Sequence, residues 1–231
     1  LSRAGEPGAG CLWWLRDAGM LKNLDLSHEE ANQVAIGLSL AGLAGTRCVL
    51  ELRIAGILKN LNLSHEEANQ VAIGLSRAGE PGAECLWWLL DAGVLNNLNL
   101  SHEEANQVAI GLSLAGEQGA GCLLESHRTG MLRALDLNLD AANQVAIGLS
   151  RAGELGAECL WWLRDTDVFK NLDLSHEEAN RVVQNLSLAG PAGARRILQL
   201  LDAGVFNNLS QEELEGVQAN IERLRGLGAG A

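Results

Sequence analysis

Apolar residues recur with helical spacing in a segment that appears several times along the chain. In one copy the apolar positions are Ala68, Val71, Ala72 and Leu75. They fall at i, i+3, i+4 and i+7, which places them on one face of a helix. Ser64 precedes this stripe and Glu67 lies three residues later, a pattern typical of a capping box that satisfies backbone N–H groups of the first turn. The pattern predicts an amphipathic helix that begins just after Ser64.

A glycine-containing segment and a second apolar stretch follow each predicted helix. The segment reads Ala-Gly-x-x-Gly in all six copies and is typical of a tight turn between antiparallel helices. We therefore expect a second helix over about 83–92, ended by Gly93 in a left-handed conformation. Gly74 lies near the end of the first stripe. It either ends the first helix there or allows another helix to approach closely.

This pair of predicted helices repeats with a period of 37 residues. The string Ala-Asn-Gln-Val-Ala-Ile-Gly-Leu-Ser begins at residues 31, 68, 105 and 142, and a diverged copy begins at 179. Cysteine follows the same period, at Cys11, Cys48, Cys85, Cys122 and Cys159. A two-helix unit cannot bury both of its apolar stripes alone, whereas stacked copies can. The sequence therefore predicts an all-α fold, an α-solenoid of about six two-helix repeats.

The repeat defines one helical-repeat domain over residues 1–231. We expect a partial first unit at 1–26, units that begin at 27, 64, 101, 138 and 175, and a C-terminal capping helix over 210–226. The last segment carries more charge than its counterparts, as a terminal capping helix requires. Residue 1 falls inside a unit, so we interpret the sequence as a fragment or as a chain whose upstream residues are missing.

A second period of 74 residues lies within the first. Tryptophan pairs occur at 13–14, 87–88 and 161–162, and the intervening units carry Leu50-Glu51, Leu124-Glu125 and Leu198-Gln199. The first position of each pair is always large and apolar, so we expect it in the core. The second alternates with Glu or Gln and is not expected to be fully buried. Two interpretations remain open for Trp14, Trp88 and Trp162: a stripe of binding anchors, or a seal over the seam between units.

A column just before the glycine segment alternates with the same 74-residue period. It reads Arg3, Leu40, Arg77, Leu114, Arg151 and Leu188. Arg3, Arg77 and Arg151 can be solvated, can stack on a tryptophan of the same unit, or can line a groove. They join the tryptophans as candidate partner-binding residues.

Composition narrows the possible partners. Hydrophobic residues make up 47% of the chain, enough for a sizeable core, and 17 basic against 29 acidic residues give a net charge of −12. Such an acid surplus disfavours a protein built to bind phosphates. No apolar run reaches the length of a membrane span. The cysteines have no partners at disulfide or CxxC spacing, so we expect buried free thiols and a reducing compartment, either the cytoplasm or the interior of a host cell.

The sequence offers no recognisable catalytic chemistry. Each His-Glu-Glu-Ala-Asn segment has Asn where a zinc-binding His-Glu-x-x-His helix has its second histidine. We therefore interpret His28, His65, His102 and His176 as exposed residues of the capping region, and we place the single His127 on the surface. There is no nucleophile elbow and no phosphate-binding glycine loop. We expect no metal, no cofactor, no small-molecule substrate and no enzymatic activity.

The unit Leu-Ser-x-Glu-Glu…Gln-Val-Ala-Ile-Gly-Leu-Ser, followed by a glycine loop and Gly-Ala-x-Cys-Leu, resembles the repeat of transcription-activator-like effectors. This resemblance implies a right-handed superhelical α-solenoid that wraps around DNA, with one loop residue per unit facing one base. The residues carried over to those loop positions are Leu40, Arg77, Leu114, Arg151 and Leu188.

Taken together, these patterns predict a right-handed α-solenoid with a non-enzymatic role. We expect a scaffold for protein–protein interaction or for self-assembly. Sequence-specific binding of double-stranded DNA is the alternative that follows from the resemblance. The acidic charge of the chain favours the protein partner.

Overall fold

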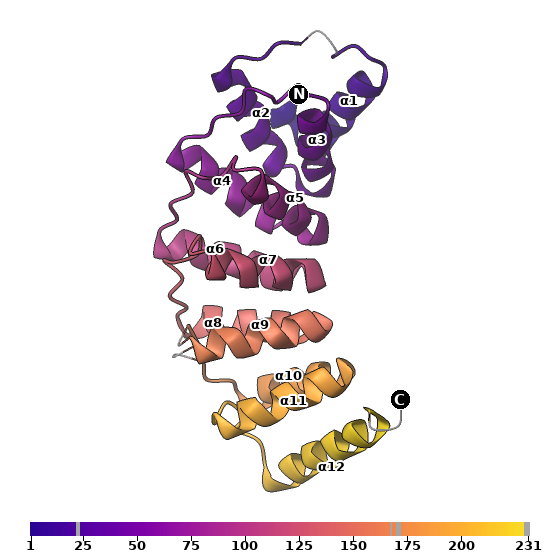
Figure 1. The fold of residues 1–231 in the computed structure, drawn as a ribbon, viewed down its shortest axis with the longest axis vertical. Helices are drawn as coiled ribbons and strands as arrows, with labels where there is room; N and C mark the ends of the chain where they lie inside the picture. Colours follow the sequence, from indigo (N-terminus) through magenta and orange to yellow (C-terminus); the bar gives the residue numbers. More distant parts are fainter. Residues whose placement is uncertain (22–23, 167, 170–171, 229–231) are drawn as a thin grey trace.

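A computed structural model describes residues 1–21, 24–166, 168–169 and 172–228 of the chain. Pairs of helices are stacked one above another along the long axis, from the N-terminus at one end to the C-terminus at the other (Figure 1). Each unit contributes a first and a second helix. The first helices are α2 (His28–Ser39), α4 (His65–Ser76), α6 (His102–Ser113), α8 (Leu139–Ser150) and α10 (His176–Leu188). The second helices are α1 (Gly5–Asp17), α3 (Gly42–Ile54), α5 (Gly79–Asp91), α7 (Gly116–Arg128), α9 (Gly153–Asp165) and α11 (Gly190–Asp202).

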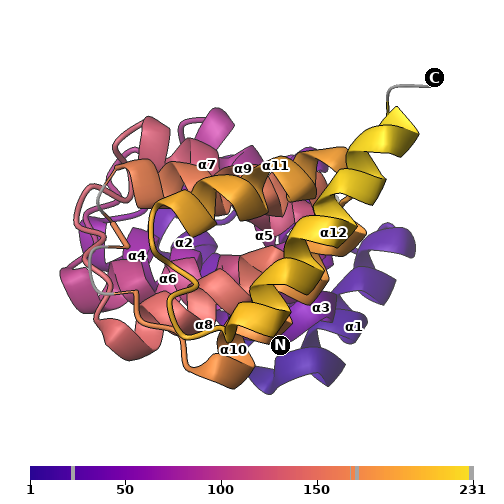
Figure 2. The ribbon, with the colours of Figure 1, turned by 90° about the horizontal axis from the view of Figure 1, so that it is seen from below.

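The helices form two layers in which each helix contacts its equivalents in the neighbouring units. First helices pack on first helices and second helices on second helices, and the two helices of one unit contact each other. Seen along the stack, successive pairs turn about the long axis (Figure 2). A 3-10 turn (Ser2–Ala4) precedes α1, and α12 (Gln211–Gly228) packs mainly on α11. The predicted α-solenoid with a 37-residue period is confirmed.

Each first helix begins as predicted from its capping residues. The Ser64 hydroxyl accepts a hydrogen bond from the Glu67 backbone N–H, and the Glu67 carboxylate accepts one from the Ser64 N–H at 2.9 Å. The same capping box opens α2, α6 and α10. In α8 the cap is Asn138, whose side chain accepts from the Ala141 N–H at 2.9 Å. Caps of this kind stabilise a helix by about 1 kcal/mol each.

The two glycines between the helices have different roles, and the prediction for the second one was wrong. Gly79 has φ +69° and is the first residue of α5, so the second helix begins four residues earlier than expected. Gly82 therefore lies inside α5 rather than in a loop. A Cβ atom on Gly82 would collide with the Leu75 carbonyl oxygen at the end of α4. The absence of a side chain lets α5 pack directly on the backbone of α4.

The glycine near the end of each first helix serves close packing between units. α4 continues through Gly74 to Ser76, so the helix does not end at this glycine. A Cβ atom on Gly74 would lie 2.8 Å from the Ser39 carbonyl oxygen of the preceding first helix. In the last full unit the equivalent residue is Asn185, which instead donates a hydrogen bond to the Ser150 hydroxyl at 2.9 Å.

A column of asparagines in the first helices joins consecutive units. The Asn69 side chain donates to the Asn99 carbonyl at 2.9 Å and accepts from the Asn99 N–H at 3.1 Å, and it also donates to Glu104 at 3.2 Å. The two-point bond to the connecting segment that leads into the next unit recurs at Asn32, Asn106 and Asn143. Asn69 is buried. The repeated Ala-Asn-Gln string thus encodes the contact that fixes one unit on the next.

The closely packed glycine can be tested against a second glycine in the same helix. In α7, a Cβ atom on Gly119 would collide with the Leu112 carbonyl oxygen, whereas one on Gly121 would meet only Leu155 Cδ1, at 3.9 Å. We expect Gly119→Ala to lower the free energy of unfolding by about 3 kcal/mol through overpacking. Gly121→Ala should raise it by about 0.5–1 kcal/mol, because alanine favours the helix. Urea denaturation followed by circular dichroism measures both values, and a similar effect of the two substitutions would contradict the packing described above.

The asparagine column can be tested at Asn69. We expect Asn69→Ala to lower the free energy of unfolding by about 1–2 kcal/mol, because the Asn99 backbone loses both partners. Gln70→Ala, on the exposed side of the same helix, is the matched control and should change it by no more than about 0.5 kcal/mol. If urea titrations give the same loss in the free energy of unfolding for both variants, the hydrogen bonds of Asn69 contribute no more to stability than an exposed glutamine side chain.

Candidate protein-binding surface

The six tryptophans lie along the second helices, and their exposure does not follow the predicted order. Trp14 is 64% and Trp87 is 43% exposed. The other four are half-buried: Trp13, Trp88, Trp161 and Trp162. The expectation that the first member of each pair lies in the core is therefore wrong at Trp87, whereas Trp161 packs against the core. Trp88 and Trp162 pack against the core as the second members of their pairs.

Trp162 covers part of the seam between two units. Its ring meets the ring of His127 from α7 edge to face, with centroids 4.7 Å apart and an interplanar angle of 83°. Such aromatic pairs contribute about 0.5–1.5 kcal/mol beyond the area they bury. His127 is half-buried, and its Nε2 atom is buried without a hydrogen-bond partner. The placement of His127 on the surface was therefore wrong, because the tryptophan of the next unit covers it.

At the N-terminal end of the second-helix layer, an arginine is held between an aromatic ring and two carboxylates. The Arg16 guanidinium carbon lies 4.5 Å from the centroid of the Trp13 ring. The guanidinium donates from Nη2 and Nε to Asp17, at 2.5 and 3.1 Å, and from Nη1 to Glu51 of the next unit. The hydrogen bond to Asp17 is the main cause of a raised pKa for Arg16. No sequence pattern had predicted an individual role for this arginine.

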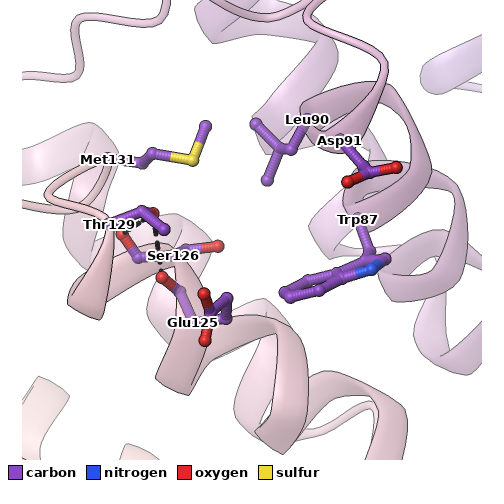
Figure 3. A pocket seen from close by; sticks show the side chains of 7 residues that line it. All are labelled: Trp87, Leu90, Asp91, Glu125, Ser126, Thr129 and Met131. Atoms are coloured by element: carbon purple, nitrogen blue, oxygen red, sulfur yellow. Dashed lines mark hydrogen bonds between the residues drawn. The ribbon is translucent and has the colours of Figure 1, made fainter.

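A pocket of about 150 Å³ lies between α5 and α7. Figure 3 shows the Trp87 ring from α5 reaching toward Glu125 of α7, with Asp91 on the same helix as the tryptophan. Leu90 and Met131 form the apolar side of the pocket. Glu125 forms a 3.6 Å ion pair with Arg128, and the Arg128 and Glu125 side chains are 60% and 40% exposed. The pocket thus combines an exposed indole with two carboxylates.

The C-terminal edge of the first helices presents the alternating arginine and leucine column. Arg77 donates to Gln107 of the next unit at 2.7 Å, and Arg3 donates to Gln33 at 2.5 Å. Arg151 is exposed. The leucines of the column are exposed as well, namely Leu40, Leu114 and Leu188. A pocket of about 390 Å³ at this edge is lined by Arg77, Gln107, Ile110 and Leu114, among others.

The first-turn histidines are exposed, as expected, and each also contacts the connecting segment at the end of its own unit. Nδ1 of His102 bonds to the Ala134 carbonyl at 2.6 Å and that of His176 to the Asn208 carbonyl at 3.0 Å, and His28 and His65 bond to the equivalent carbonyls. Since a carbonyl only accepts, Nδ1 carries the proton in these bonds. No group of three or more potential metal ligands occurs in the part of the chain that the structure describes.

Four of the five cysteines are buried free thiols, as predicted: Cys48, Cys85, Cys122 and Cys159. Burial raises the pKa of Cys85 to about 12 and that of Cys48 and Cys122 to about 11, so these thiols stay protonated at neutral pH. Cys11, in the first unit, is exposed. The expectation of burial was wrong there: among the described residues α1 packs on one other second helix, α3, whereas each helix that carries a buried cysteine packs on two.

The fold and these surfaces define a helical tandem-repeat protein of the solenoid type. No protein-family model matches the chain, and no curated protein sequence is significantly similar to it. Within the described ranges, none of the helices combines the length and the hydrophobicity needed to span a bilayer.

Proposed function

We propose that this protein is a non-enzymatic scaffold that binds a protein partner through the surface of its second helices. The observation that carries the proposal is the exposure of Trp87 beside a pocket of mixed apolar and acidic character. Exposing a tryptophan ring to water is unfavourable in free energy, and tryptophan is enriched among the residues that dominate protein interfaces. Trp14 adds a second exposed indole in the same layer of helices.

The charge of the chain indicates the kind of partner. A net charge of −12 attracts basic surfaces and speeds their association. A stack of nearly identical units also presents an extended surface without large loops. Both features favour a basic protein segment that lies across several second helices.

The proposal predicts that Trp87 is needed for binding but not for folding. Peptides selected from a displayed random library against the wild-type protein should bind Trp87→Ala at least about tenfold more weakly, as expected for an interface anchor. The melting temperature should change little, because the ring is partly exposed. Leu43→Ala, which removes a side chain of the same 43% exposure from α3, is the matched control and should leave binding unchanged.

Two results would contradict a partner-binding surface at Trp87. One is a set of selected peptides whose affinity is the same for wild type and Trp87→Ala. The other is concentration-dependent assembly of the purified protein, measured by light scattering, that Trp87→Ala abolishes. The second result would assign this surface to self-assembly instead.

Sequence-specific DNA binding is the second candidate, because Arg77 lines a pocket at the edge where the effector-like loop residues lie. Three observations weigh against it. Arg77 is already bonded to Gln107, the neighbouring Leu114 exposes an apolar side chain, and the chain carries a large acid surplus. A surface with these features lacks the concentrated positive charge that contacts with DNA phosphates require.

We therefore expect no binding to a labelled pool of mixed-sequence duplexes. Fluorescence anisotropy across a salt series is the measurement, and the lowest salt is the most sensitive condition because electrostatic attraction is strongest there. A rise in anisotropy that persists at high salt and depends on DNA sequence would overturn this expectation. Arg77→Ala would then identify whether the loop edge faces the bases.

A further inference from the structure

The pocket at Trp87 has a counterpart 74 residues earlier in the chain. In that counterpart an arginine side chain of the protein itself already occupies the equivalent place. Trp13, Asp17 and Glu51 correspond to Trp87, Asp91 and Glu125. In the earlier copy the Arg16 guanidinium stacks on the indole and donates to both carboxylates. The chain itself therefore shows which chemical group this arrangement of one ring and two carboxylates accepts.

The copy at Trp87 has the same acceptor groups without the guanidinium. The residue that corresponds to Arg16 is Leu90, which has no charge and no donor. Trp87 is exposed, whereas Trp13 beneath Arg16 is half-buried. Among the described residues, Glu125 forms a 3.6 Å ion pair with Arg128, and ion pairs that are open to solvent are weak.

The third copy of this arrangement, at Trp161, does not have the same combination of residues. Position 164 is again arginine, and its Nη2 donates to the Ala203 carbonyl at 3.4 Å. Glu125 is replaced there by Gln199, which accepts a hydrogen bond from Arg196 at 2.7 Å. Among the three copies, only the middle one combines the tryptophan and both carboxylates with an apolar residue in place of the arginine.

We propose that the pocket formed by Trp87, Asp91 and Glu125 binds an arginine side chain of a protein partner. This inference rests on the proposed function and names the group that the surface recognises. The guanidinium would take the place that Arg16 occupies in the first copy, stacked on the indole and shared between the two carboxylates. A volume of about 150 Å³ suits one such group, since an engineered cavity of that size accepts benzene.

Guanidinium suits this geometry better than a lysine ammonium. Its planar face stacks on an aromatic ring while its edge donates to carboxylates, and it is less strongly hydrated than an ammonium. A lysine ammonium is a compact point charge without a planar face, so it cannot stack on the indole and donate to both carboxylates in the same way. Leu90 and Met131 would contact the methylene stem of the incoming side chain.

The test uses the full chain and the tripeptide amide acetyl-Gly-Arg-Gly as the probe. Titration is followed by the indole N–H signals of the six tryptophans in ¹H–¹⁵N spectra, with Trp87 assigned from Trp87→Phe. We expect the arginine peptide to shift the Trp87 signal. The same peptide with citrulline, the uncharged isostere of arginine, should bind about tenfold more weakly, because charge-assisted hydrogen bonds are lost.

Variants that exchange residues between the first and second copies of the site provide the decisive test. Leu90→Arg restores the residue found in the first copy and should abolish the shift, because an internal guanidinium fills the pocket. Leu90→Met, of similar size and without charge, should retain binding and shows that any loss is not caused by altered packing. Arg16→Leu should create a second responsive tryptophan, Trp13.

Each contrary outcome is distinct. Equal affinity for arginine and citrulline, or equal loss with Leu90→Met and Leu90→Arg, would overturn the arginine site. If library-selected peptides bind in a Trp87-dependent way but lack arginine, this inference fails while the proposed binding surface stands. If no displayed peptide depends on Trp87 and the arginine tripeptide leaves its signal unchanged, the proposed binding surface fails as well.

Discussion

The architecture depends on the direct contact between two helical backbones at a glycine. In each unit the second helix can approach the carbonyl end of the first only because no Cβ atom stands at that point, as at Gly82 against Leu75. This contact sets the distance and the angle between the two helices of a unit. Since the same glycine recurs with the 37-residue period, every unit has the same internal geometry. These similar units then stack along one axis into an elongated solenoid, in which successive helix pairs are turned relative to one another (Figures 1 and 2).

Contact between units involves polar groups as well as apolar ones. The buried leucines and alanines supply the hydrophobic stabilisation, which is non-directional. The asparagine column adds direction, because Asn69 must meet both the N–H and the carbonyl of Asn99. The histidine beside the cap bonds to the same connecting segment. Together these bonds fix the register of each unit on the next, and they explain why Asn and His recur at positions where an apolar stripe alone would not require them.

The sequence predicted the solenoid well because its signals are local and repeated. Capping boxes, apolar stripes and the Gly93 column depend on a few neighbouring residues. It failed where the outcome depends on contacts between helices. Gly82 has the sequence features of a turn residue, yet lies inside a helix because α4 ends against it. His127 was placed on the surface, yet is covered by a ring from the following unit. That ring belongs to Trp162, which lies 35 positions from His127, and no pattern within one unit reveals such a contact.

The same reasoning explains why the candidate site was found only in part. Alternation with a 74-residue period correctly drew attention to the tryptophan pairs, but the exposure of each ring is decided by its neighbours. The Trp13 ring is stacked beneath Arg16, whereas the corresponding Trp87 has Leu90 beside it and stays exposed. In a repeat protein, a single replacement can therefore remove a group from an internal contact and leave its partners facing solvent. The repeat provides the same acceptor groups in each copy, and divergence at one position decides whether they are bonded within the chain or face solvent.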